Sequence, residues 1–120
     1  MAGKVVINLT AGAEDPEAAT IAFLVGTAAQ AAGNDVVVFC TKEAVRLAQS
    51  SEVAAVEAEG RPALADLSRQ FAEAGGELLL CPVCVKTRDL DGAEFDANAR
   101  VAGAAVLWEW IGDGATVFTY

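Results

Sequence analysis

The sequence predicts an α/β fold, a three-layer α/β/α sandwich built on a mainly parallel five-stranded sheet. Three observations lead to this prediction. Short apolar runs of strand length alternate along the chain with segments of helical periodicity. The runs are apolar at successive positions, which is typical of parallel strands covered on both faces. Turns rich in glycine or opened by proline separate the segments, so we expect each strand to reach the next through a right-handed crossover.

The first βα unit begins at the N-terminus. Residues 4–9 are an apolar run of strand length, and we place this strand at the centre of the sheet. The loop 10–15 leads to Asp15 and Pro16, a typical N-cap and first helical residue for a helix over residues 16–32. Gly-Asn follows and ends the helix. Its larger apolar residues at helical spacing are Ile21, Leu24 and Val25.

The second unit starts with residues 35–40, another strand of the buried type. Thr41 can cap a short helix that starts at Lys42. Residues 50–60 fit no single pattern, and within them residues 53–56 are a candidate short edge strand.

The second half repeats the alternation. Pro62 opens a helix with an apolar face, and Gly-Gly ends it before a strand at residues 77–80. An acidic, turn-rich loop at 89–95 precedes a helix expected over residues 96–111, which is apolar around much of its circumference. A last strand is expected over residues 115–120. Apolar positions all round the last helix indicate burial within the domain or contact with a partner subunit.

Composition limits the classes of function. A chain of 120 residues is expected to form one domain over residues 1–120, with a core that needs no disulfide or metal. The net charge of −9 argues against direct nucleic-acid binding, because no basic stripe is available for phosphates. The apolar run near the N-terminus is too short for a signal peptide, and no stretch has membrane-spanning length. We therefore expect a cytoplasmic protein with no membrane partner.

The Cys-Pro-Val-Cys motif at residues 81–84 is the main candidate site. Cys81 ends an apolar run, and Pro82 suits the first position of a helix. Cys81 is then the N-cap, with its sulfur near the free N–H groups of the first turn, which favour thiolate over thiol. Cys84 lies three residues further on the same helical face and is either a resolving thiol or a packing residue. We predict Cys81 and Cys84 as the chemically active residues.

Other residues are weaker candidates. Backbone N–H groups in the loop that carries Thr10 and Gly12 are able to cradle an anionic sulfur species, although a turn and a cap explain these residues equally well. Lys86 and Arg88 either raise the positive potential near the thiolate or form a solvated helix face. Cys40 ends a strand and is expected in the core.

Several chemistries are excluded by residue type. The sequence contains no histidine, so Ser-His-Asp and Cys-His catalysis are absent. There is one Cys-X-X-Cys motif, so a closed four-ligand zinc site within one chain is excluded as well. Nothing in the sequence indicates a cofactor. In a reducing compartment a close cysteine pair indicates thiol chemistry or metal binding, not a structural disulfide.

Several stretches in this order resemble the DsrE/DsrF-like family. They are the first strand with its glycine-containing loop, the Ala-rich helix ending in Ala-Ala-Gly-Asn, the Val-Val-Val-Phe strand, Gly-Gly-Glu-Leu-Leu-Leu-Cys-Pro-Val-Cys at residues 75–84 and Trp-Glu-Trp-Ile at 108–111. The resemblance implies an α/β/α sandwich of flavodoxin-like appearance and assembly into trimers or hexamers. It also implies a role in sulfur oxidation or tRNA thiolation relays, with Cys81 at the position that carries sulfur as a persulfide.

Three functional classes stay open. We favour a sulfur carrier, in which Cys81 accepts sulfur from a donor protein or small persulfide and passes it to an acceptor. The second class is a dithiol–disulfide oxidoreductase that uses both cysteines, as in the glutaredoxin motif, although glutaredoxins carry that motif after their first strand. The third is a non-enzymatic oligomeric binding or regulatory protein, in which subunits pool thiolates around a metal.

Overall fold

The computed structural model describes residues 3–120, which form an α/β fold around one five-stranded sheet. The strands are β1 (Lys4–Leu9), β2 (Asp35–Cys40), β3 (Glu77–Leu80), β4 (Ala99–Val101) and β5 (Thr116–Thr119). The helices are α1 (Pro16–Ala31), the 3₁₀ helix η1 (Lys42–Ala48), α2 (Ser50–Ala54), α3 (Leu64–Glu73), α4 (Pro82–Thr87) and α5 (Ala104–Ile111). The fold class predicted from the sequence is confirmed.

Every strand pairing in the sheet is parallel, and the strand order is β4-β3-β2-β1-β5. The expectation that the first strand is central was wrong, because β2 occupies the middle and β1 lies between β2 and β5. Strands β1 and β2 are both mainly apolar and have the same burial pattern, so their composition alone did not distinguish the two positions. The carboxyl ends of β1, β2 and β3 meet at one edge of the sheet, because these strands pair in parallel.

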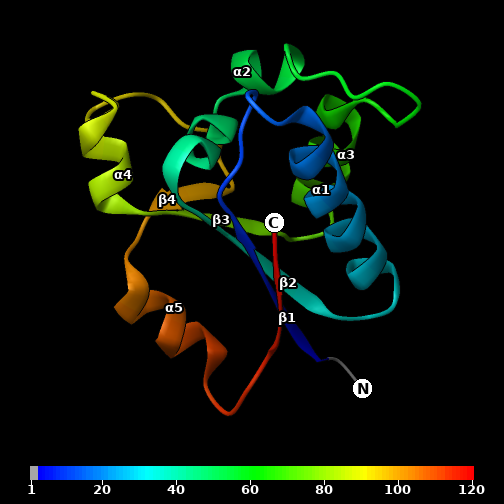
Figure 1. Cartoon of the computed structure of the whole chain (residues 1–120). Helices are drawn as coiled ribbons and strands as arrows, with labels where there is room; N and C mark the ends of the chain where they lie inside the picture. The colour runs from blue at the N-terminus through cyan, green and yellow to red at the C-terminus, as the bar shows by residue number, and fades with distance from the viewer. Residues whose placement is uncertain (1–2) are drawn as a thin grey trace.

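Alternate residues of β1, β2 and β3 enter two separate cores. One face contributes Ile7, Val38 and Leu80 to a large cluster beneath α1, α3 and η1. The other face contributes Val6, Val37 and Leu79 to a smaller cluster against α5. Figure 1 shows this layering, with α1 and α3 on one side of the sheet, α5 on the other and α4 beyond the end of β3.

Small residues let α1 lie close to the sheet. The residues of α1 that are fully buried are Ala19, Thr20, Ala22, Phe23 and Gly26. Ile21, Leu24 and Val25, the larger apolar residues, are only partly buried. An alanine Cβ in place of the Gly26 hydrogen would lie 3.2 Å from the Ile7 side chain, so alanine there would require a shift of a few tenths of an ångström. Asp15 caps the helix through its carboxylate, which accepts a hydrogen bond from the Ala18 N–H at 3.1 Å.

Two segments differ from the sequence-based expectation. The candidate edge strand within residues 50–60 is absent, because residues 50–54 form α2 and pack against α3. The fifth strand is instead β4, which lies inside the helix expected over residues 96–111. Asn98 donates a side-chain hydrogen bond to the Gly76 carbonyl, and its own carbonyl accepts the Leu78 N–H, so pairing with β3 overrides helical propensity there.

Helix α5 is correspondingly short, and no residue in it is fully buried. Its partly buried residues are Val106, Leu107, Trp110 and Ile111, whereas Trp108 is 71% exposed. Helix α3 begins at Leu64, two residues after Pro62. Within residues 3–120, none of the helices has the length and apolar character needed to cross a membrane.

Candidate functional site at Cys81

Cys81 lies at the first residue beyond β3. The last ladder pair joins Cys40 to Leu80, and the Cys81 N–H then donates a 2.9 Å hydrogen bond to the Cys40 carbonyl. Its backbone is extended (φ −56°, ψ 121°), as expected for a residue before proline, and Pro82 begins α4. Cys81 is therefore the N-cap of α4, with its thiol at the carboxyl edge of the sheet.

The surroundings of the Cys81 thiol favour its ionised form. Partial burial opposes ionisation, but the N–H groups of Cys84 and Val83, the Cys84 side chain and the positive charge of Arg88 outweigh it. The pKa of Cys81 therefore lies below its ordinary value. Among the described residues, the Cys81 side chain makes no capping hydrogen bond of ordinary geometry. The N–H groups and the Arg88 charge therefore influence the ionisation of the thiol, but they do not hold the sulfur in a capping position.

Cys81 and Arg88, the two caps of α4, lie on the same side of the helix axis as Cys84. At about 100° per residue, Arg88 lies roughly 20° from Cys81 around the helix axis, and Lys86 lies about 140° away. Val85 on the same side is buried and anchors α4 to the main core, while Cys84 is partly buried against that core. The cation that shares the cysteine face is thus Arg88, and Lys86 is exposed on another face.

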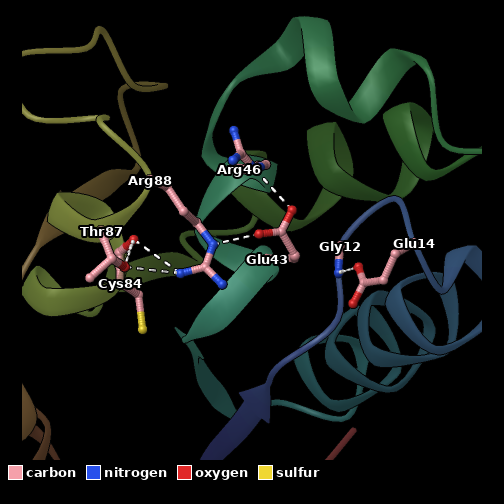
Figure 2. Close-up of polar contacts among 7 residues, drawn as sticks. All are labelled: Gly12, Glu14, Glu43, Arg46, Cys84, Thr87 and Arg88. Carbon is pink, nitrogen blue, oxygen red and sulfur yellow. Dashed lines mark hydrogen bonds and ion pairs between the residues drawn. The ribbon is translucent and has the colours of Figure 1, made fainter.

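Arg88 connects α4 to η1 (Figure 2). Its Nε donates to Glu43 Oε2 at 2.5 Å, and its Nη1 donates to the carbonyl oxygen of Cys84 at 3.3 Å. Arg46 donates to the other Glu43 oxygen at 2.9 Å, so two guanidinium groups hold one carboxylate. The hydrogen bond from Arg88, followed by that from Arg46, keeps the pKa of Glu43 below its ordinary value despite partial desolvation.

Thr10 and Gly12, the other candidate binding residues, lie at the end of β1. The Thr10 hydroxyl donates to the Tyr120 carbonyl at 3.0 Å, so it links β1 to the C-terminal residue. The Gly12 N–H donates to the Glu14 carboxylate. A Cβ at Gly12 would lie 2.6 Å from the Glu43 carbonyl oxygen, which shows how closely this loop approaches η1. Gly12 and Arg88 thus flank Glu43, as Figure 2 shows.

Cys40 is separate from this chemistry. It is fully buried in the main core, as the sequence predicted, and burial raises the pKa of its thiol to about 12. All three cysteines are free thiols. Within the described part of the chain, no group of three or more Cys, Asp or Glu side chains is arranged to hold a metal ion.

Sequence reasoning missed Glu43 and Arg46. A single acidic residue at the start of a short helix gave no chemical signal, because its partner Arg88 is 45 residues away in the sequence. In the sequence, the position of Arg88 about two helical turns after Cys81 was the signal that the two residues share one side of a helix. A hollow of about 580 Å³ between α2, α3 and residues 96–98 was not anticipated either, and it does not include the cysteines.

The structure combines a parallel α/β fold with a free cysteine at the end of β3. The chain belongs to the DsrE/DsrF-like family, whose model matches residues 3–120. This membership supports a protein of the sulfur-relay type. No curated protein matches the sequence significantly.

Two solved structures share the fold. The YchN protein from E. coli superposes with a TM-score of 0.78 at 14% identity, covering 98% of this chain and 99% of that one. The MTH1491 protein from Methanobacterium thermoautotrophicum, described as a protein of unknown function, gives a TM-score of 0.61 at 13% identity, with 98% and 99% coverage. At these identities the two structures establish the common fold.

Proposed function

We propose that this protein is a sulfur carrier in which Cys81 holds sulfur as a persulfide. The observation that carries the proposal is the placement of Cys81, at the end of β3 and at the start of α4, with surroundings that lower its pKa. Family membership supports the same class of chemistry. The donor is a protein that carries a persulfide or a small persulfide, the acceptor is a thiol, and nothing in the site requires a cofactor.

The transfer step balances without an external oxidant. The Cys81 thiolate attacks the outer sulfur of a donor persulfide, the donor S–S bond breaks, and a new S–S bond forms on Cys81. The donor leaves as its thiolate, and the proton of the donor persulfide stays on the transferred sulfur. An acceptor thiolate then repeats the attack on the loaded Cys81, which returns to its thiolate form.

The two other cysteines fit this role less well. Cys40 is fully buried, with a pKa of about 12, so it presents no thiolate to a donor at neutral pH. Cys84 is partly buried and follows Cys81 by one helical turn. Cys81 is partly buried as well, but Cys84 lies within α4 and not at the end of the strand, so we assign it to attack on a loaded Cys81 and not to the first uptake of sulfur.

Intact-mass analysis after exposure to a persulfide donor tests the proposal. We expect an adduct of about 32 Da, one sulfur atom, that maps to Cys81. Cys81→Ser should abolish the adduct, and Cys40→Val should leave it unchanged. An adduct of equal yield in Cys81→Ser, or none in the wild-type protein with an active donor, would contradict the carrier function.

A further inference from the structure

We propose that Glu43 is a positioning residue that holds Arg88 against α4, where the guanidinium stabilises the Cys81 thiolate. The inference rests on the proposed function, because it concerns the form of Cys81 that accepts sulfur. It assigns a role to an ion pair between two elements that are distant in sequence. Cys81 itself remains the residue that reacts.

The contacts of Arg88 show why it needs an external anchor. Arg88 follows the last residue of α4, Thr87, and an arginine at such a position is able to extend into solvent. Here its side chain is only 22% exposed, and it reaches back along the helix to the carbonyl oxygen of Cys84. The ion pair with Glu43 accounts for this direction, since η1, which carries Glu43, lies beside α4.

Glu43 is itself held on both sides. Arg46 binds its second carboxylate oxygen, and the Gly12 loop lies against its backbone. The rest of η1 is anchored by four fully buried residues, Ala44, Val45, Leu47 and Ala48. Glu43 therefore offers Arg88 a fixed acceptor, which an unanchored carboxylate on a flexible loop would not.

The direction of the expected change in thiol acidity distinguishes this proposal from other roles of Glu43. Removing a carboxylate from the neighbourhood of a thiol ordinarily makes the thiol more acidic, because a like charge disappears. If Glu43 acts by positioning Arg88, its removal does the opposite: Arg88 swings toward solvent and Cys81 loses a favourable charge. A purely structural role of Glu43 would not predict that its removal makes the Cys81 thiol less acidic.

The test measures iodoacetamide alkylation of Cys81 against pH in a Cys84→Ser background. Arg88→Gln and Glu43→Gln are each expected to slow the reaction at neutral pH by roughly two- to tenfold and to shift its pH profile upward. The double variant should be no slower than Arg88→Gln, because the two residues act as one unit. Glu77→Gln is the matched control: it breaks an ion pair with Arg100 at the opposite end of β3, about 13 Å along the strand from Cys81, and should leave the rate unchanged.

An unchanged or faster reaction in Glu43→Gln, or additive slowing in the double variant, would overturn the positioning role. If Glu43→Gln fails to fold, Glu43→Asp takes its place, because it keeps the charge but withdraws the carboxylate by one methylene. Slower alkylation of Cys81 in Glu43→Asp supports the proposal, and an unchanged rate overturns it. Alkylation requires no sulfur donor. A failure of persulfide loading is therefore distinguishable from a failure of this inference.

Discussion

The backbone N–H of Cys81 donates a 2.9 Å hydrogen bond to the carbonyl oxygen of Cys40. This bond extends the parallel ladder between β2 and β3 by one step and holds two cysteines of opposite character side by side in the backbone. Cys40 is buried, with its pKa raised to about 12, whereas the pKa of Cys81 is lowered at the edge of the sheet. Accessibility and nearby charge, not residue type, account for the opposite pKa shifts of the two thiols.

Cys40 should make the protein less stable in alkaline solution. In the unfolded chain its thiol ionises near its ordinary pKa of 9.0, but in the folded protein it stays protonated to about pH 12. The folded state therefore holds a proton that the unfolded state releases, and the free energy of unfolding falls by about 1.4 kcal/mol per pH unit within this window.

Urea denaturation at several pH values between 8 and 11 would measure this effect against Cys40→Val, where roughly this part of the pH dependence should vanish. Lysine and tyrosine ionisation affects both proteins alike. Identical slopes in the two proteins would show that Cys40 is exposed to solvent or ionised in the native state.

Cys84 should shorten the lifetime of a loaded Cys81. Its thiolate is able to attack the inner sulfur of the persulfide, which releases hydrosulfide and leaves a Cys81–Cys84 disulfide. We expect Cys84→Ser to retain or lengthen the load measured by mass spectrometry, and the wild-type protein to be a poor catalyst of glutathione-coupled disulfide reduction. Efficient catalysis that is lost in both cysteine variants would instead favour a dithiol–disulfide oxidoreductase.

We propose that the protein assembles as a trimer or a multiple of three, with α5 and β5 contributing to the contact. Trp108, Val117 and Phe118 on these elements are large hydrophobic residues, and they are 71%, 55% and 40% exposed. Light scattering should give a trimeric or hexameric mass that falls in Trp108→Glu. Val101→Glu is the control, because it places the same charge at the opposite edge of the sheet. A monomeric wild-type protein, or dissociation in Val101→Glu but not in Trp108→Glu, would contradict the assignment.

Gly12 should be required for the close approach of its loop to η1. In Gly12→Ala the new Cβ would lie 2.6 Å from the Glu43 carbonyl oxygen, so the loop or η1 must shift. We expect a loss of about 1–3 kcal/mol in the free energy of unfolding. Ala13→Ser, at an exposed position of the same loop, is the control and should be neutral within roughly 0.5 kcal/mol. A neutral Gly12→Ala would show that the loop has room.

The sequence alone determined the α/β fold, the bounds of β1, β2 and β3, the Asp15 cap and the placement of Cys81 before a helix that starts at Pro82. These features depend on local physics. They are set by apolar runs, by capping side chains and by the restriction that proline imposes on its neighbour. Each of these acts over a few residues, so a short stretch of sequence is enough to recognise it.

The tertiary structure decided the rest, because it depends on pairings between distant segments. Residues 99–101 became a strand because β3 offered an open edge, and α2 replaced the candidate strand because α3 covers its apolar side. Glu43 and Arg88 carry no sign of each other in the sequence, yet parallel strand pairing places η1 beside α4 and brings their side chains together. The electrostatic surroundings of Cys81 are therefore a property of the fold, while the cysteine at the strand end is a property of the sequence.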